Sequence, residues 1–150
     1  MKAVLQRVSQ AEVQINGKPF NTIQKGLVVL LGFSHQEDLE TLEWMKKKIL
    51  SLRIFGDAED KLNLSVQDVD GEILLISQFT LYADCKKGNR PSFIKAGKPE
   101  YSEAVYTQFV KLMSEEYPKV KTGQFGADMK VSLTNNGPVT IILEKGTPAE

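Results

Sequence analysis

The sequence predicts an α+β domain with a mostly antiparallel or mixed β-sheet. Segments with the composition of strands and helices follow one another in the order strand, strand, strand, helix, strand, helix, strand, strand. No helix joins every pair of strands, which disfavours a doubly wound parallel sheet. The chain has 150 residues, of which 41% are hydrophobic and 25% charged, as is typical of a soluble globular protein. We therefore expect one domain, residues 1–150.

Three strands are expected near the N-terminus. Residues 3–15, AVLQRVSQAEVQI, alternate between apolar and polar side chains over their second half. The sequence NGK then predicts a tight turn into a second strand, residues 19–23. Residues 26–33, GLVVLLGF, are apolar at nearly every position, which indicates a strand buried on both faces.

Two amphipathic helices and three further strands complete the prediction. The first helix spans residues 36–53, with Asp38 placed to cap it, and the second spans residues 101–117, ending before Pro118. Their core-facing residues recur at helical spacing: Leu42, Met45, Ile49 and Leu52 in the first, and Tyr101, Val105, Phe109 and Leu112 in the second. The remaining strands are expected at residues 71–84, 127–133 and 139–146.

The stretch NNGPVT, between the last two predicted strands, has two interpretations. Asn136-Gly137 suits a two-residue hairpin turn, because both residues tolerate positive φ. Pro138, however, has no N–H to donate where the returning strand should begin. The alternative is a cis Gly-Pro bond that turns neighbouring carbonyl groups outward to bind the ammonium group of a ligand.

Polar residues also gather at the end of the strand that begins at residue 71. Ser77, Gln78 and Thr80 follow an apolar run, at the kind of position where loops and ligands meet. A strand that simply leaves the core would show the same change. Beyond it, residues 84–99 carry five positive charges and one acid, which fits either a solvated loop or a phosphate-binding patch. The basic residues are Lys86, Lys87, Arg90, Lys95 and Lys98.

Composition excludes several other classes of function. The 19 basic and 19 acidic side chains cancel, which argues against a protein that coats nucleic acid through a general basic field. With one histidine, His35, and one cysteine, Cys85, a zinc site would need carboxylates for most of its ligands; no such cluster is visible, and we expect no metal. The single cysteine, the absence of a secretory segment and the shortness of every apolar run predict a cytoplasmic protein without membrane partners.

Taken together, the motifs SQFTL and N-x-G-P-V-T resemble the D-aminoacyl-tRNA deacylases of the bacterial and eukaryotic type, the D-tyrosyl-tRNA deacylase family. MKAVLQRV, LRIFGD, KLNLSV, RPSF and FGADMKVSL are similar to that family as well, so the resemblance covers nearly the whole chain. It implies a homodimer of β-barrel-like subunits with helices packed outside. The implied reaction is hydrolysis of the ester at the terminal adenosine of D-aminoacyl-tRNA, without a cofactor and without a DNA partner.

The resemblance also assigns roles to residues. It implies that Ser77, Gln78, Phe79 and Thr80 hold the adenosine and the scissile ester. A cis Gly137-Pro138, opened by Asn135 and supported by Arg7, is implied to enter the pocket of the other subunit and read chirality. The basic residues Lys86, Lys87 and Arg90 would then contact tRNA phosphates.

No histidine or lysine is placed to activate the hydroxyl of Ser77 or Thr80. We therefore expect backbone N–H groups near Phe79 and Thr80 to stabilise the oxyanion, with water attacking and the substrate's 2′-hydroxyl assisting. Glycyl-tRNA, which has no side chain to reject, is expected to be hydrolysed too. Three alternatives stay open: a module that only binds charged tRNA, an esterase or amidase for small D-amino acid derivatives, and a purely structural dimer.

Overall fold

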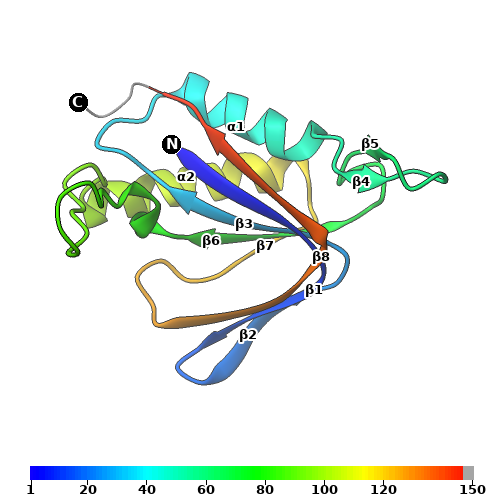
Figure 1. Cartoon of the computed structure of the whole chain (residues 1–150), viewed down its shortest axis with the longest axis horizontal. Coiled ribbons are helices and arrows are strands. Elements are labelled where there is room, and N and C mark those ends of the chain that lie inside the picture. The colour runs from blue at the N-terminus through cyan, green and yellow to red at the C-terminus, as the bar shows by residue number, and fades with distance from the viewer. Residues whose placement is uncertain (147–150) are drawn as a thin grey trace.

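A computed structural model describes residues 1–146 of the chain; the last four residues of the predicted domain lie outside that range. The fold is α+β, with two main helices over a nearly closed, barrel-like mixed sheet, as predicted (Figure 1). No helix among the described residues is long and apolar enough to cross a bilayer. The elements are β1 Lys2–Ile15, β2 Lys18–Ile23, β3 Gly26–Gly32, α1 Leu39–Ser51, β4 Phe55–Gly56, β5 Leu62–Leu64, β6 Glu72–Ser77, the 3-10 helix η1 Phe79–Tyr82, α2 Pro99–Glu116, β7 Val120–Thr122 and β8 Met129–Glu144.

Strand β1 organises the sheet. It pairs antiparallel with β3 and then β2 along one edge, and with β8 along the other edge from Lys2 to Ile15. Beyond β3 the sheet continues through β6 and β7, both parallel to their neighbours. Side chains bring β7 back to β2: Asn21 donates to the Thr122 carbonyl at 2.7 Å, and Lys121 donates to the Thr22 carbonyl at 2.7 Å. These contacts nearly close the barrel.

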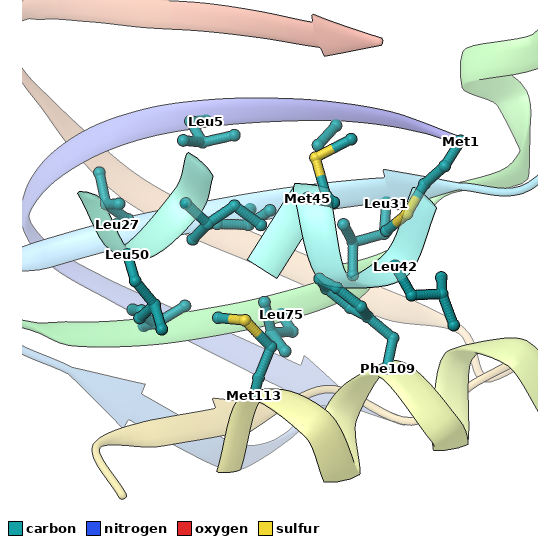
Figure 2. Close-up of a cluster of buried hydrophobic side chains, with 14 of the residues drawn as sticks. Met1, Leu5, Leu27, Leu31, Leu42, Met45, Leu50, Leu75, Phe109 and Met113 are labelled. Atoms are coloured by element: carbon teal, nitrogen blue, oxygen red, sulfur yellow. The ribbon is translucent and has the colours of Figure 1, made fainter. Parts of the chain in front are cut away.

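Apolar side chains fill both faces of the sheet, which explains why β3 is apolar at nearly every position. On one face, Leu42 and Met45 of α1 and Phe109 of α2 pack against Leu31 of β3 and Leu75 of β6 (Figure 2). On the other face, a second buried cluster fills the barrel interior; its members are Val8, Ala11, Val13, Ile23, Val28, Leu74 and Ile76. The predicted inward faces of both helices are confirmed, although Leu52, Tyr101 and Leu112 are only partly buried.

Several boundaries differ from the sequence prediction. The first helix begins at Leu39 rather than residue 36, because the Asp38 carboxylate caps it by accepting the Thr41 N–H at 2.8 Å. The strand expected over residues 71–84 ends at Ser77, where the chain turns into η1. The β4–β5 hairpin and β7 were not predicted, because each strand has only two or three residues and gives no periodic signal.

Of the two interpretations of NNGPVT, the hairpin turn at Asn136-Gly137 is wrong, and the cis Gly137-Pro138 bond is confirmed. Residues 129–144 form one strand, β8, which pairs with β1 both before and after a cis Gly137-Pro138 bond. The ladder is interrupted between Asn135 and Thr140, so residues 136–139 bulge out opposite Arg7. A proline is acceptable there, because a residue in a bulge has no ladder hydrogen bond to donate.

Two side chains fix this bulge to the rest of the molecule. Arg7 donates from Nε to the Asn136 carbonyl at 2.8 Å and from Nη1 to the Ile54 carbonyl at 3.0 Å. Asn135 donates from Nδ2 to the Val139 carbonyl at 3.0 Å and to the Arg7 carbonyl at 3.4 Å. The bulge is thus tied at both of its ends, although Gly137 and Pro138 themselves are exposed.

A side chain at position 137 would be strained and crowded. The φ of Gly137 is +137°, and an added Cβ would lie 2.8 Å from Arg7 Nη2 and 2.9 Å from Val139 Cγ2. Backbone strain and side-chain crowding therefore act together at this position.

We expect Gly137→Ala to lower the free energy of unfolding by roughly 2–6 kcal/mol, because the strain and the overpacking each cost about 1–3 kcal/mol. Gly88→Ala is the matched control: Gly88 also has positive φ, +66°, but nothing lies within 4 Å of an added Cβ. Its cost should stay near 1 kcal/mol. Urea unfolding at one fixed protein concentration measures both, and equal losses would show that crowding against Arg7 contributes nothing.

Candidate active site

A cavity of about 670 Å³ opens where β6 ends. This volume falls in the range of small-molecule sites. Its walls come from the junction of β6 and η1, the segment leading into α2, and the turn before β8. The lining residues are Ile76, Ser77, Gln78, Phe79, Phe93, Ala96, Gly97, Lys98, Pro99, Ser102, Phe125, Gly126, Ala127, Asp128, Met129 and Val131.

The structure brings three of the four residues predicted from SQFT into this cavity. Ser77 is the last residue of β6, and the Gln78 N–H still reaches the Leu31 carbonyl at 2.7 Å before the chain turns. Ser77, Gln78 and Phe79 line the cavity, whereas Thr80 is exposed beside them. The Gln78 amide donates to Thr80 Oγ1 at 2.5 Å, which couples the two polar side chains.

Two backbone donors beside the cavity have no partner. Phe79 and Thr80 open the 3-10 helix η1, so their N–H groups have no carbonyl within the helix to bond. Within residues 1–146 no other acceptor reaches them. Adjacent free N–H groups of this kind are suited to stabilise an oxygen that gains negative charge.

Nearby phenols and the histidine are not poised as bases. Burial raises the pKa of Tyr82 far above its usual range, and burial raises the pKa of Tyr106 to about 12, with its hydroxyl donating to the Leu75 carbonyl at 2.8 Å. Both phenols are therefore neutral at physiological pH. His35 Nε2 is hydrogen-bonded to the Ile94 carbonyl, and no hydrogen bond joins His35 to Ser77 within residues 1–146. Among the described residues, no three His, Cys, Asp or Glu side chains gather as metal ligands would.

Sequence reasoning missed two walls of the cavity. One is the turn from Phe125 to Met129, to which the sequence analysis gave no role in a site, although GQFGAD carries two glycines next to a strand. The other is the entry to α2. There the Gly97 N–H bonds the Phe33 carbonyl at 2.9 Å, and an added Cβ would lie 2.5 Å from the Ser34 carbonyl oxygen. Ser102 Oγ is buried in this wall without a partner among residues 1–146.

The five basic residues of segment 84–99 differ in whether they have an acidic partner and in whether they line the cavity. Asp84 and Ser92 exchange two backbone hydrogen bonds, of 2.8 and 2.9 Å, and close off a loop, residues 85–91. Lys86, Lys87 and Arg90 are exposed on this loop and make no ion pair within the part of the chain described here; the free thiol of Cys85 is exposed there too. In contrast, Lys95 lies 3.6 Å from Asp84, and Lys98 lines the cavity. Hydrogen bonding from the Lys86 N–H lowers the pKa of Asp84, so this carboxylate stays charged at the base of the loop.

Gly137, Pro138, Asn135 and Arg7 do not join the cavity of their own chain. Ser77 aligns through β3 with Ala3 of β1, while Arg7 lies four residues further along β1, roughly 13 Å away at 3.3 Å per residue. The bend in β8 and helix η1 accordingly lie at opposite ends of the sheet (Figure 1).

Comparisons with known proteins agree with the fold and the motifs. The family model described as D-Tyr-tRNA(Tyr) deacylase matches residues 4–144. The protein named D-aminoacyl-tRNA deacylase of Flavobacterium johnsoniae is 52% identical over 145 residues, covering 96% of this chain and 97% of that protein. Its namesake in Clostridium botulinum is 51% identical over 144 residues, with the same coverage.

Two solved structures share the fold. The structure named c-Myc DNA Unwinding Element Binding Protein has a TM-score of 0.93 and 43% identity, and the match covers 98% of this chain and all of that one. A structure described as a probable eukaryotic D-amino acid tRNA deacylase has a TM-score of 0.81 over 95% of this chain and 97% of that one; at 18% identity it supports the fold alone. The match over residues 4–144 and the relatives above half identity show that the chain belongs to the D-Tyr-tRNA(Tyr) deacylase family.

Proposed function

We propose that this protein hydrolyses the ester bond of D-aminoacyl-tRNA and releases the free D-amino acid and tRNA. One observation carries the proposal: two unpaired backbone N–H groups, at Phe79 and Thr80, lie beside a largely apolar cavity. The names of the curated relatives support the same reaction. The ester of an aminoacyl-tRNA is already reactive, so a site without a nucleophile–base couple suffices.

The cavity suits the terminal adenosine. Phe125, Met129 and Val131 offer apolar surface for the base, and Ser77 and Gln78 offer polar groups at the β6 end. On this proposal the ester carbonyl lies at the junction of β6 and η1. The tRNA backbone then leaves the cavity toward the exposed basic residues of the loop 85–91.

We propose that hydrolysis proceeds without an acyl-enzyme. Water adds to the ester carbonyl, and the Phe79 and Thr80 N–H groups stabilise the oxyanion that forms. The bond between the acyl carbon and the ribose 3′-oxygen then breaks, and the carboxylic acid leaves. The substrate's 2′-hydroxyl relays the proton from the attacking water to the departing 3′-oxygen, so no protein base is required.

Chirality is proposed to be read by Gly137 and Pro138 of a second copy of the chain. Two features support this: both residues are exposed on a bulge tied by Arg7 and Asn135, and both lie far from their own cavity. With the ammonium group and the ester held, an L side chain would meet this backbone wall, while a D side chain would point away. Rejection by backbone does not depend on which L side chain arrives, and glycine has none to reject.

The chain is proposed to act in the cytoplasm, without a cofactor and without a DNA partner. Although one structural relative is named for DNA binding, the net charge here is zero, and the unpaired basic residues considered above share one loop beside the cavity. A module that only binds charged tRNA would need no oxyanion donors. An esterase for small D-amino acid derivatives would need no basic loop.

The first prediction of the proposed function concerns stereochemistry. One tRNA charged with D-tyrosine or with L-tyrosine presents the same ester and the same RNA, so only chirality differs. We expect the D ester to be hydrolysed at least about 100-fold faster, equivalent to roughly 2.7 kcal/mol, and glycyl-tRNA to be hydrolysed as well. Binding of the charged tRNA without loss of either ester would instead support the binding module. Complete resistance of glycyl-tRNA would contradict the steric account of selection.

The second prediction concerns the nucleophile. Thr80→Ala should retain activity within about tenfold of wild type, because the Thr80 N–H remains. Charged tRNA ending in 2′-deoxyadenosine should react roughly 100-fold more slowly, since it lacks the proton relay. Single-turnover rates measure both effects, with circular dichroism confirming that the variant folds. A folded but inactive Thr80→Ala would favour a covalent acyl-threonine.

The third prediction concerns assembly. Light scattering of the purified protein should give twice the mass of one chain, because each cavity needs residues 136–139 of a second copy. A monomer that still discriminates between D and L esters would rule out selection across subunits.

A further inference from the structure

Two of the seven large hydrophobic residues exposed in the described part of the chain form an unusual rim beside the cavity. Ile94 is 82% exposed, the highest value among these seven, and its neighbour Phe93 is 38% exposed. Phe93 also lines the cavity and contacts Phe79 edge-on, with ring centroids 5.1 Å apart. Ile94 therefore exposes a large apolar side chain directly after a residue of the cavity wall.

This rim is held rigidly. The Ala96 N–H bonds the Phe93 carbonyl at 3.0 Å, so Ile94 and Lys95 occupy the tip of a tight turn. His35 bonds the Ile94 carbonyl, and Lys95 is directed to Asp84. Turn tips are usually polar. An exposed isoleucine fixed at such a tip indicates that a binding partner covers it.

The segment carrying His35 is also fixed in place. The Glu37 carboxylate accepts the Ser34 N–H at 2.7 Å and pairs with the Met1 ammonium at 2.8 Å. Gly97, on the other side of the turn, is bonded to Phe33 of the same segment. The turn that presents Ile94 is therefore braced by groups that do not depend on any ligand.

The charge next to this rim indicates what covers it. The loop 85–91 is closed by Ser92, which directly precedes Phe93. The loop carries the unpaired Lys86, Lys87 and Arg90. Exposed apolar side chains at the edge of a nucleoside-sized cavity, flanked by positive charge, are suited to bind single-stranded nucleic acid.

We infer that Phe93 and Ile94 form a platform on which the base of the penultimate nucleotide of the tRNA 3′ end stacks. The inference rests on the proposed function, in which the terminal adenosine fills the cavity. The phosphate between the two nucleotides passes the rim, and the preceding phosphates lie near Lys86, Lys87 and Arg90. The rim thus extends recognition by one nucleotide beyond the cavity and selects a polynucleotide end over a free aminoacyl nucleoside.

Three minimal substrates test the platform. They are D-tyrosyl-adenosine, the D-tyrosyl ester of the dinucleotide cytidylyl-adenosine, and the same dinucleotide with an abasic first position, which keeps the phosphate and loses the base. Wild-type kcat/KM should be about 5- to 100-fold higher for the dinucleotide than for the other two, as expected for one stacked base.

Ile94→Ser is the variant to compare, because Ile94 does not line the cavity. It should lower kcat/KM for the dinucleotide by roughly 5-fold or more and leave D-tyrosyl-adenosine unchanged. The control is Leu62→Ser, which removes an equally aliphatic side chain, 50% exposed, from the β4–β5 hairpin at the opposite end of the molecule (Figure 1). It should change neither rate.

Each other outcome overturns the inference in a distinct way. Equal rates on the dinucleotide and its abasic form would mean that the phosphate alone is recognised. An equal loss on all three substrates would place Ile94 in the reaction site itself. A change in assembly mass caused by Ile94→Ser would make the rim a contact between copies of the chain. If the wild-type protein hydrolyses D-tyrosyl-tRNA but none of the three minimal substrates, the platform is wrong and the proposed function stands. If it hydrolyses neither D-tyrosyl-tRNA nor the minimal substrates, the proposed function is wrong as well.

Discussion

Strand β1 pairs with β8 on one edge from Lys2 to Ile15, with interruptions at Arg7 and Ser9, and divides its other edge between β3 and β2. A central strand buried in this way must satisfy nearly every backbone group through its neighbours. This requirement fixes the positions of β8 and β3 relative to each other. The cavity forms at one end of the resulting sheet, beyond β6, while the bulge of β8 forms further along β1.

The two ends are specialised by different means. At the β6 end, the chain leaves the ladder and exposes unpaired N–H groups next to an apolar cavity. At the other end, the chain stays in the ladder but inserts residues 136–139, which Arg7 and Asn135 tie in place. The proposed oxyanion donors and the segment proposed to select substrates are thus both backbone groups, whose positions depend on pairing rather than on side-chain rotamers.

Local patterns predicted the parts of the fold that local forces determine. The faces of α1 and α2 and the burial of β3 follow from periodicity, and the polar end of β6 was visible as SQFT. The course of β8 was not predictable, because Asn136-Gly137 suits a turn and only the free edge of β1 keeps the strand straight on either side. The walls contributed by Phe125 and Ser102 were also missed, since they meet the cavity only after α2 and β8 pack. The sequence did not show that Lys95 has an acidic partner. The pairing of Asp84 with Ser92 brings the Asp84 carboxylate close to Lys95.

The distance between the bulge and the cavity within one chain has a consequence for accuracy in the cell. On the proposed arrangement, a separated chain would keep its cavity and oxyanion donors but lose the wall that excludes L side chains. Such a chain would attack correctly charged tRNA, so dilution would make the protein harmful rather than merely inactive. Natural selection would then act on the affinity between two copies, because a free copy causes damage. It would favour a dimer that forms at protein concentrations far below those needed for activity.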